Sequence, residues 1–378
     1  MNTAVAFAAQ DGQLDPSVVR GPIRAPSAWT PGSFTSSADY SSHLPAGVER
    51  ELRRIVTGTR IASLDHQEIT LAEFGTPALK QLMDGVHHEL WDGRGFMLLK
   101  GLPIAGLSIE QIQAFYWLLT LYLGKPVSQS AAGERIGFVQ DRTRPGQLQT
   151  ERGYTSRREL PLHTDGGDFM GLLCVRAGLS GGLSVGTSIH SVYNTMLEQC
   201  PELLPRLFRG FPYHRKGEQP DDQPMVTPYN VPVLAWINDR LSARYIRPSM
   251  DTAYKALGRE WDPLDTRALD TFDNICWDDD HLIRFMMEPG DLYLASNWTT
   301  LHSRTEFIDH DEQEKKRLML RIWLQREPRT PVPRNMCNYQ NPSGDLGIDG
   351  KPGGKPAGAE YLTHFKQRPI AIPEGAKQ

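Results

Sequence analysis

The stretch LPLHTDGGDF, residues 160–169, places an imidazole (His163) and a carboxylate (Asp165) two positions apart, ahead of a pair of glycines. Alternate residues of a strand point to the same side, so both side chains could bind one metal ion. Divalent iron used for oxygen chemistry favours two imidazoles and one carboxylate, and it keeps positions open for substrate and oxygen. The alternative is an ordinary turn, in which Asp and Gly only supply turn chemistry.

A third ligand has to come from a distant strand, and three late histidines are candidates. His281 lies in the charged turn DDDHL and His310 in the charged loop FIDHDEQEKK. His302 follows a Pro-Gly-Asp turn and an apolar run in EPGDLYLASNWTTLHSRTEF, where an inward-pointing ligand is expected. We therefore predict His302 as the ligand. The others, together with His190 at a helix start, are interpreted as surface or hydrogen-bonded core histidines.

Arg317 and Arg321 lie four residues apart in KKRLMLRIWLQ, among apolar neighbours. In a strand both face the same side, and an arginine on the inner face of an apolar strand requires an anionic partner. Two of them indicate a dianionic guest, or a guest together with a protein carboxylate. The alternative is an edge strand whose arginine side chains extend to water.

The elements that position these residues begin with a helical part, residues 46–125. Helices are expected to start at Ala46, Thr76 and Ser108, the last two with N-capping side chains. The apolar run GFMLLKGL, bounded by glycines, is predicted as a strand. Before this part, residues 1–45 lack periodicity and are expected to form a loose arm, or a strap laid over the fold.

The chain then changes character, because residues 127–160 are polar and rich in Gly, Arg and Ser. They are predicted to form a long lid loop. Within 161–326, the runs MGLLCVRAG, PVLAWIN, LIRFMMEPGDLYLASN and RLMLRIWLQ predict the strands of a sandwich or barrel. Helices are expected for SIHSVYNTMLEQCPELLPRLF and over residues 264–275. Residues 327–378 are Pro/Gly-rich and are expected to form a surface extension.

Composition limits the partners of the chain. It has 378 residues and a net charge of -4 without long runs of one sign, so no basic surface for nucleic acid or anionic membrane is expected. Four dispersed cysteines indicate free thiols in a cytoplasm. Neither a signal peptide nor a membrane span is expected. The interpretation is a cytoplasmic protein with a single domain over 46–326 and a small-molecule substrate, with a homo-oligomer left open.

Taken in order, these motifs resemble the clavaminate synthase-like group of iron(II)/2-oxoglutarate oxygenases, the taurine dioxygenase family. The matching stretches are LPLHTDGGDF, AGLSGGLSVGTSIHSVYNTMLEQCPELL, PGDLYLASNWTTLHSRTEF and KRLMLRIWL, within roughly residues 75–326. A bare His-x-Asp occurs in many loops, whereas this ordered set is specific. The resemblance implies a mainly β fold with flanking α-helices, a distorted double-stranded β-helix related to the jelly roll.

The resemblance also implies the chemistry. His163, Asp165 and His302 resemble the catalytic ligands of Fe(2+), and the expected reaction hydroxylates an unactivated C–H bond with 2-oxoglutarate and O2, releasing succinate and CO2. Related halogenases replace the carboxylate by a small residue so that chloride can bind. Asp165 therefore favours hydroxylation, or desaturation or ring formation by the same oxidant.

Four further residues acquire roles from the resemblance. Arg317 resembles the arginine that binds the far carboxylate of 2-oxoglutarate in a bidentate pair. Ser184 stands where the family usually has a threonine, whose hydroxyl touches the same carboxylate. Arg321 matches a position that faces the primary substrate in some members. Asn297 matches a common asparagine ahead of the distal histidine.

The lid is expected to determine the substrate. Its candidate contacts are Gln129, Arg152, Tyr154, Arg157 and Arg158. Their arginines favour an anionic or zwitterionic small molecule, and the alternative is a solvated basic loop.

Two other classes of protein remain open. A zinc-dependent hydrolase or isomerase in the same barrel would keep the His/Asp/His set but would not need Arg317 in its core. A non-catalytic jelly-roll binding protein would need neither feature.

Overall fold

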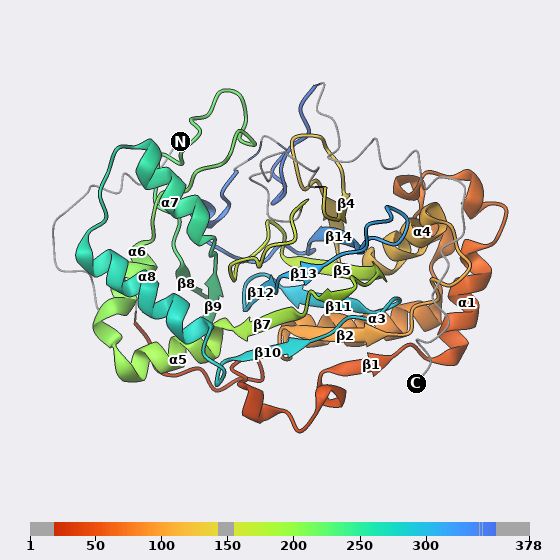
Figure 1. Cartoon of the computed structure of the whole chain (residues 1–378), viewed down its shortest axis with the longest axis horizontal. Coiled ribbons are helices and arrows are strands. Elements are labelled where there is room, and N and C mark those ends of the chain that lie inside the picture. Colours follow the sequence, from red (N-terminus) through yellow and green to blue (C-terminus); the bar gives the residue numbers. More distant parts are fainter. Residues whose placement is uncertain (1–18, 143–154, 340, 342, 353–378) are drawn as a thin grey trace.

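The structure, a computed structural model, describes residues 19–142, 155–339, 341 and 343–352. Two β-sheets lie at its centre, with helices at both ends (Figure 1). In spatial order, the seven-stranded sheet consists of β1 (Ser41–His43), β2 (Phe96–Lys100), β11 (Leu292–Ser296), β5 (Phe169–Arg176), β14 (Leu318–Gln325) and β3 (Lys125–Val127), and β4 (Ile136–Val139) also pairs with β14. This sheet is mixed, because β1 runs parallel to β2 while the other neighbours are antiparallel.

A smaller antiparallel sheet carries one of the candidate metal ligands. Its spatial order is β10 (Leu282–Phe285), β7 (Ser184–Ser188) and β12 (Thr300–Arg304). Two two-stranded pairs complete the β structure: β6 (Ser180–Gly181) with β13 (Phe307–Ile308), and β8 (Leu234–Ile237) with β9 (Arg240–Ala243).

The helices fall into two groups, seen at opposite ends of Figure 1. The first group is α1 (Ala46–Val56), α2 (Leu71–Phe74), α3 (Pro77–Trp91) and α4 (Ile109–Thr120). The second group is α5 (Ile189–Gln199), α6 (Leu204–Arg209), α7 (Arg247–Ala256) and α8 (Pro263–Cys276). Short 3₁₀ turns are η2 (Pro31–Ser33), η3 (Ser37–Asp39), η4 (Ile61–Ser63), η5 (His66–Glu68), η7 (Pro201–Leu203) and η8 (Arg334–Met336).

The three largest of the four hydrophobic cores among the described residues define the layers of the fold. The first packs the apolar sides of α1, α3 and α4 against one face of the large sheet. The second packs α5, α6 and α8 against the small sheet. The third lies between the two sheets, where Phe285 of β10 meets Tyr293 of β11. The candidate site residues therefore have to face this inner space.

Strand β14 shows how the inner space is lined. Successive side chains of a strand point to opposite faces. Leu320 and Ile322 belong to the core under the helices, whereas Met319 and Trp323 belong to the core between the sheets. Arg321 lies between the last two and so takes the inner face.

Most of the expected elements are present. Helices begin after Pro45, Thr76 and Ser108, and the Thr76 and Ser108 hydroxyls accept hydrogen bonds from the N3 amides of their helices, at 3.2 and 3.3 Å. The helix expected over 264–275 is α8. Every apolar run predicted as a strand contains one, so the period-2 and capping signals are confirmed.

One expected helix is divided. The run SIHSVYNTMLEQCPELLPRLF forms α5, the turn η7 and α6 rather than a single helix. Pro201 and Pro205 occupy first-turn positions of η7 and α6. Since proline has no N–H for a preceding carbonyl, each starts a new element instead of continuing the old one.

The prediction of a continuous loop over 127–160 is wrong in part. Residues 136–139 form β4, which pairs with Met319–Ile322 of β14 and continues the large sheet. Residues 143–154 lie outside the described residues. The polar composition of the segment concealed a short strand of only four residues.

The chain ends that were expected to be loose are packed where the structure describes them. Residues 19–45 form a strap rather than a free arm, since Trp29 is buried and β1 joins β2. The interpretation of 327–378 as a surface extension is wrong for its described part, because Met336 and Ile348 are buried and the Ile348 amide donates to Ser128.

Two expectations from composition can be compared with the structure. All four cysteines are free thiols: Cys174, Cys200, Cys276 and Cys337. In the ranges that the structure describes, no helix combines the length and apolar character needed to cross a bilayer.

Candidate metal centre

A single backbone bridge brings the two distant histidines together. His163 precedes β5, and its amide donates to the carbonyl of His302 at 3.1 Å, while the amide of His302 donates back at 3.0 Å. Residues paired in this way project to the same side, and the two ring centroids lie 4.4 Å apart. The Nδ1 atom of His163 lies 2.8 Å from the Pro161 carbonyl and must donate to it, which leaves Nε2 as the free donor for a metal.

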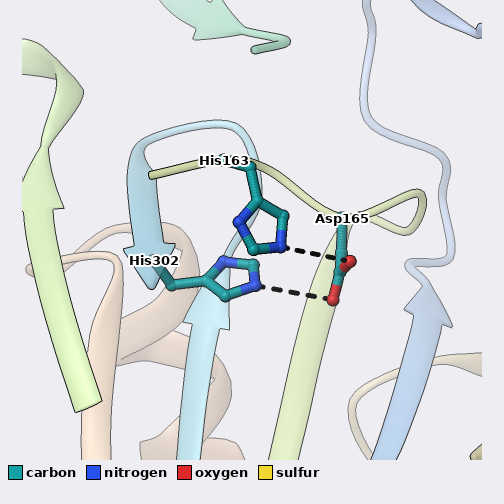
Figure 2. A group of neighbouring side chains, drawn as sticks. All are labelled: His163, Asp165 and His302. Atoms are coloured by element: carbon teal, nitrogen blue, oxygen red, sulfur yellow. Dashed lines mark ion pairs between the residues drawn. The ribbon is translucent and has the colours of Figure 1, made fainter. Parts of the chain in front are cut away.

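Asp165 is held by a side chain that comes just before β12. The amide of Asp165 donates to Oδ1 of Asn297 at 2.9 Å, and Nδ2 of Asn297 donates to the Gly167 carbonyl at 3.0 Å. The guanidinium of Arg244 donates to the Asp165 carbonyl. These contacts fix the loop backbone, so the carboxylate faces the two rings (Figure 2).

The three side chains form a compact donor set. Oδ1 of Asp165 lies 3.9 Å from Nε2 of His163, and Oδ2 lies 3.5 Å from Nε2 of His302. One ligand atom from each residue lies within 4.8 Å of the others. In the described ranges, no further group of three His, Cys, Asp or Glu side chains has this spacing.

The electrostatics of the site suit a divalent cation. Burial opposes ionisation of Asp165, but the Arg321 guanidinium and the two imidazoles outweigh it and hold the pKa of this carboxyl below its usual range. Burial, then the neighbouring His302, lower the pKa of His163 to about 4. At neutral pH the site therefore offers a neutral imidazole and an ionised carboxylate, the protonation states that metal binding requires.

Two buried atoms of the site have no hydrogen-bond partner, Oδ2 of Asp165 and Nδ1 of His302. Buried polar atoms in native proteins are nearly always satisfied, by protein, water or an ion. A carboxylate that faces two imidazoles and has an unpartnered oxygen is explained by a bound cation. The set of two nitrogens and one oxygen fits iron(II) with positions left open for other ligands.

The competing histidines lie elsewhere, as expected. His190 is a buried helix residue that contacts Ser27 at 2.8 Å and the Leu241 carbonyl at 3.0 Å. His281 is buried, and both of its nitrogens contact hydroxyls of α5, so it is a hydrogen-bonded core histidine. His310 does not belong to the group of three ligands.

The two arginines of β14 and its N-terminal flank have different partners. Arg321 donates to Oε1 of Gln129 at 2.7 Å and to Oδ1 of Asp165 at 3.3 Å. Arg317 is buried, and its Nη1 has no hydrogen-bond partner. The alternative of an edge strand with solvated arginines is wrong, because β14 lies between β5 and the pair β3 and β4. Thus one arginine contacts a protein carboxylate, whereas the guanidinium of the other remains partly unsatisfied.

Ser184 begins β7 and pairs across the small sheet with Arg304 of β12. The sequence interpretation missed Arg304, although its position two residues after His302 was a usable signal, since both take the same face of the strand. Of the expected lid residues, Gln129 is buried against Arg321, and Arg157 pairs with Asp141 at 3.2 Å.

The remaining lid candidates divide between described and undescribed parts of the chain. The Arg158 carbonyl accepts a hydrogen bond from Arg304. Arg152 and Tyr154 lie outside the described residues.

Comparison with known proteins identifies the class. The model of the family described as "Taurine catabolism dioxygenase TauD, TfdA family" matches residues 60–323, and the chain belongs to this family. It is an oxidoreductase, a non-haem iron(II)/2-oxoglutarate-dependent dioxygenase whose cofactor and cosubstrates are Fe(2+), 2-oxoglutarate and O2. Membership decides against the zinc hydrolase or isomerase and against the non-catalytic binding protein.

Particular relatives extend over most of the chain. FR-33289 synthase of Streptomyces rubellomurinus is 28% identical over 334 residues, which cover 85% of this chain and 96% of the relative. The taurine hydroxylase-like protein SAT17 of Stachybotrys chartarum is 24% identical over 318 residues, covering 80% and 79%.

Two solved structures share the fold. An asparagine oxygenase in complex with Fe(II), 2S,3S-3-hydroxyasparagine and succinate has a TM-score of 0.61 at 17% identity, covering 82% of this chain and 99% of its own. The non-heme iron oxygenase OrfP in complex with Fe and alpha-ketoglutaric acid has a TM-score of 0.56 at 15% identity, covering 75% and 93%. At these identities the likeness concerns the fold.

Proposed function

We propose that His163, Asp165 and His302 hold the catalytic iron(II), and that Arg317 and Ser184 bind the far carboxylate of 2-oxoglutarate. The assignment rests on two features of the described residues. One is the compact His/Asp/His donor set, and the other is a buried arginine, Arg317, whose Nη1 has no hydrogen-bond partner. Buried guanidinium groups of this kind match carboxylates in a bidentate pair.

With iron and cosubstrates bound, the site oxidises a C–H bond with O2 while 2-oxoglutarate becomes succinate and CO2. The chain itself supplies position and charge. The Pro161 carbonyl fixes the His163 tautomer that leaves Nε2 free. Asn297 fixes the loop of Asp165 through hydrogen bonds to the Asp165 amide and the Gly167 carbonyl.

We propose that the two sheets are the two sides of a distorted double-stranded β-helix, and that residues 46–326 form one oxygenase domain. The apolar core between the sheets supports this, because it is continuous from β10 of the small sheet to β2 and β14 of the large one. The metal ligands come from both parts of this fold, since His302 lies in β12 of the small sheet and Asp165 lies just before β5 of the large sheet.

The proposed substrate is a small anionic or zwitterionic molecule of the amino-acid class, and the proposed reaction is hydroxylation. The structural relatives include oxygenases solved with hydroxyasparagine and with hydroxylated arginine. In this chain Arg321 is placed beside the metal centre, where its guanidinium could share an anionic group of the substrate once the metal occupies Asp165. The carboxylate ligand favours hydroxylation over halogenation, and desaturation is the second candidate outcome.

The experiment is a screen of free and modified amino acids for substrate-stimulated succinate release, with mass spectrometry of the product. Hydroxylation adds one oxygen atom to the substrate, whereas desaturation removes two hydrogens. His163→Ala is the negative control. Stimulation only by uncharged compounds would contradict the substrate class. An anaerobic protein that gives no visible charge-transfer band with iron(II) and 2-oxoglutarate would contradict the assigned site.

A further inference from the structure

A second buried arginine lies beside Arg317. Arg304 of β12 is 5% exposed and Arg317 is 6% exposed. Both guanidinium groups contact one aromatic ring, that of Phe307 in β13, with their central carbons 4.6 and 5.1 Å from the ring centroid. Two positive charges thus share a single small apolar surface in the interior.

The carboxylates near this pair are engaged by other groups. In the described part of the chain neither guanidinium forms an ion pair. Asp309 accepts from the backbone amide of Arg317 at 2.7 Å rather than from its side chain. Asp141, which lies near Arg304, pairs with Arg157.

The position of Arg304 directs it into the inner space. It lies two residues after His302 on β12, and alternate residues share a face. It also pairs directly with Ser184 of β7, so the two side chains are cross-strand neighbours. Arg304, Ser184 and Arg317 therefore converge from two strands and the start of a third. Buried charges in proteins are nearly always paired, so two like charges this close form a suitable site for an anion.

We infer that Arg304 and Arg317 form a two-arginine clamp for the far carboxylate of 2-oxoglutarate, so that Arg304 is a further cosubstrate-binding residue. The inference rests on the proposed function, which assigns Arg317 and Ser184 to that carboxylate. In this clamp each of the two buried guanidinium groups binds the far carboxylate, which gives both arginines an anionic partner. It makes the site selective for 2-oxo acids that carry a second carboxylate.

The competing explanation is structural. Arg304 also donates from Nε to the Thr305 carbonyl at 3.2 Å, and from Nη2 to the Arg158 carbonyl. These contacts alone would stabilise the backbone that leads to His163. A structural role predicts the same loss for every 2-oxo acid, whereas a clamp predicts a loss confined to dicarboxylates.

The experiment titrates iron(II)-loaded protein anaerobically and follows the charge-transfer band. Wild type, Arg304→Gln and Arg317→Gln are compared with 2-oxoglutarate and with 2-oxovalerate, which carries a methyl group in place of the far carboxylate. Loss of one hydrogen bond to a charged group should raise the Kd for 2-oxoglutarate about 10- to 100-fold in Arg304→Gln. The Kd for 2-oxovalerate should remain that of wild type.

Control variants distinguish a misfolded protein, an incorrect role for Arg304 and an incorrect cosubstrate site. Arg304→Lys keeps the charge and should lose less affinity, which guards against a variant that does not fold. Arg284→Gln alters an exposed arginine of β10 that pairs with Asp279 at 2.7 Å, and it should match wild type. Equal losses with both 2-oxo acids, or no loss, in Arg304→Gln would overturn the clamp. If Arg317→Gln also lacks selectivity, the proposed cosubstrate site itself is wrong.

Discussion

The metal centre depends on three side chains, each of which supplies one ligand atom. His163→Ala or His302→Ala should abolish iron-dependent turnover while the fold persists, because each removes one of three donors. Turnover and iron content measured after metal loading test this prediction. His310→Ala, outside the donor set, is the matched control. Full activity in either ligand variant would remove that residue from the set.

Replacing Arg317 and replacing Arg321 should affect different binding steps. Removing one partner of a buried charged pair typically costs about 3–5 kcal/mol, or two to three orders of magnitude in affinity, and Arg317→Ala should weaken 2-oxoglutarate binding by about that much. Arg321→Ala should leave this titration near wild type. It should weaken substrate-stimulated turnover and, because Arg321 contacts Asp165, also iron binding. Anaerobic titration of both variants with 2-oxoglutarate tests this assignment. A large loss of 2-oxoglutarate affinity in Arg321→Ala with none in Arg317→Ala would mean that the two roles are exchanged.

At the scale of elements, the loop of Asp165 is held by the segment before β12. Asn297→Ala removes the hydrogen bonds to Asp165 and Gly167, and should weaken iron binding about 10- to 100-fold. A metal titration measures it. Asn335→Ala, which removes an exposed hydrogen bond to the Asn230 carbonyl, is the matched control. Wild-type iron affinity in Asn297→Ala would mean that the loop keeps its shape without this side chain.

The start of α5 contains a pH-dependent contribution to stability. His190 is buried, and burial lowers its pKa to about 4 from the ordinary histidine value of about 6.5. Between these two values the unfolded chain binds a proton that the folded chain does not. The free energy of unfolding should therefore fall as the pH drops from about 6.5 to 4, by roughly 3 kcal/mol in all.

Denaturant unfolding at several pH values tests this contribution. His190→Gln should reduce the slope in that window by the contribution of one titrating group, while buried His163 keeps contributing. Ser27→Ala removes a hydrogen bond to Nδ1 but leaves the ring buried, so it should lower stability without flattening the slope. An unchanged slope in His190→Gln would assign the pH dependence to other groups.

For the whole molecule, the N-terminal strap completes the core between the sheets. Trp29 is 2% exposed, packs on Phe96 with ring centroids 4.8 Å apart, and donates from Nε1 to the Arg94 carbonyl at 3.0 Å. Trp29→Ala should lower the free energy of unfolding by about 3–5 kcal/mol. Trp29→Phe keeps the ring contact and should lose less. If calorimetry shows wild-type stability for Trp29→Ala, the strap is dispensable for the fold.

The sequence alone determined the features that depend on near neighbours in the chain. The caps at Thr76 and Ser108, the alternation of β14 and the spacing of His163 and Asp165 follow from local geometry. The sequence also allowed His302 to be predicted as the third metal ligand in place of the other late histidines, since a turn and an apolar strand precede it.

Only the tertiary structure decided which distant groups meet. The contact of Arg321 with Asp165, the convergence of Arg304 with Arg317 on Phe307, and the packing of Trp29 join segments far apart in the chain. The spacing of apolar residues and the helix-capping residues predict individual elements, but they do not predict which strands lie side by side. Such partners are fixed by which strands pair and in which register, and that depends on burying the whole core at once.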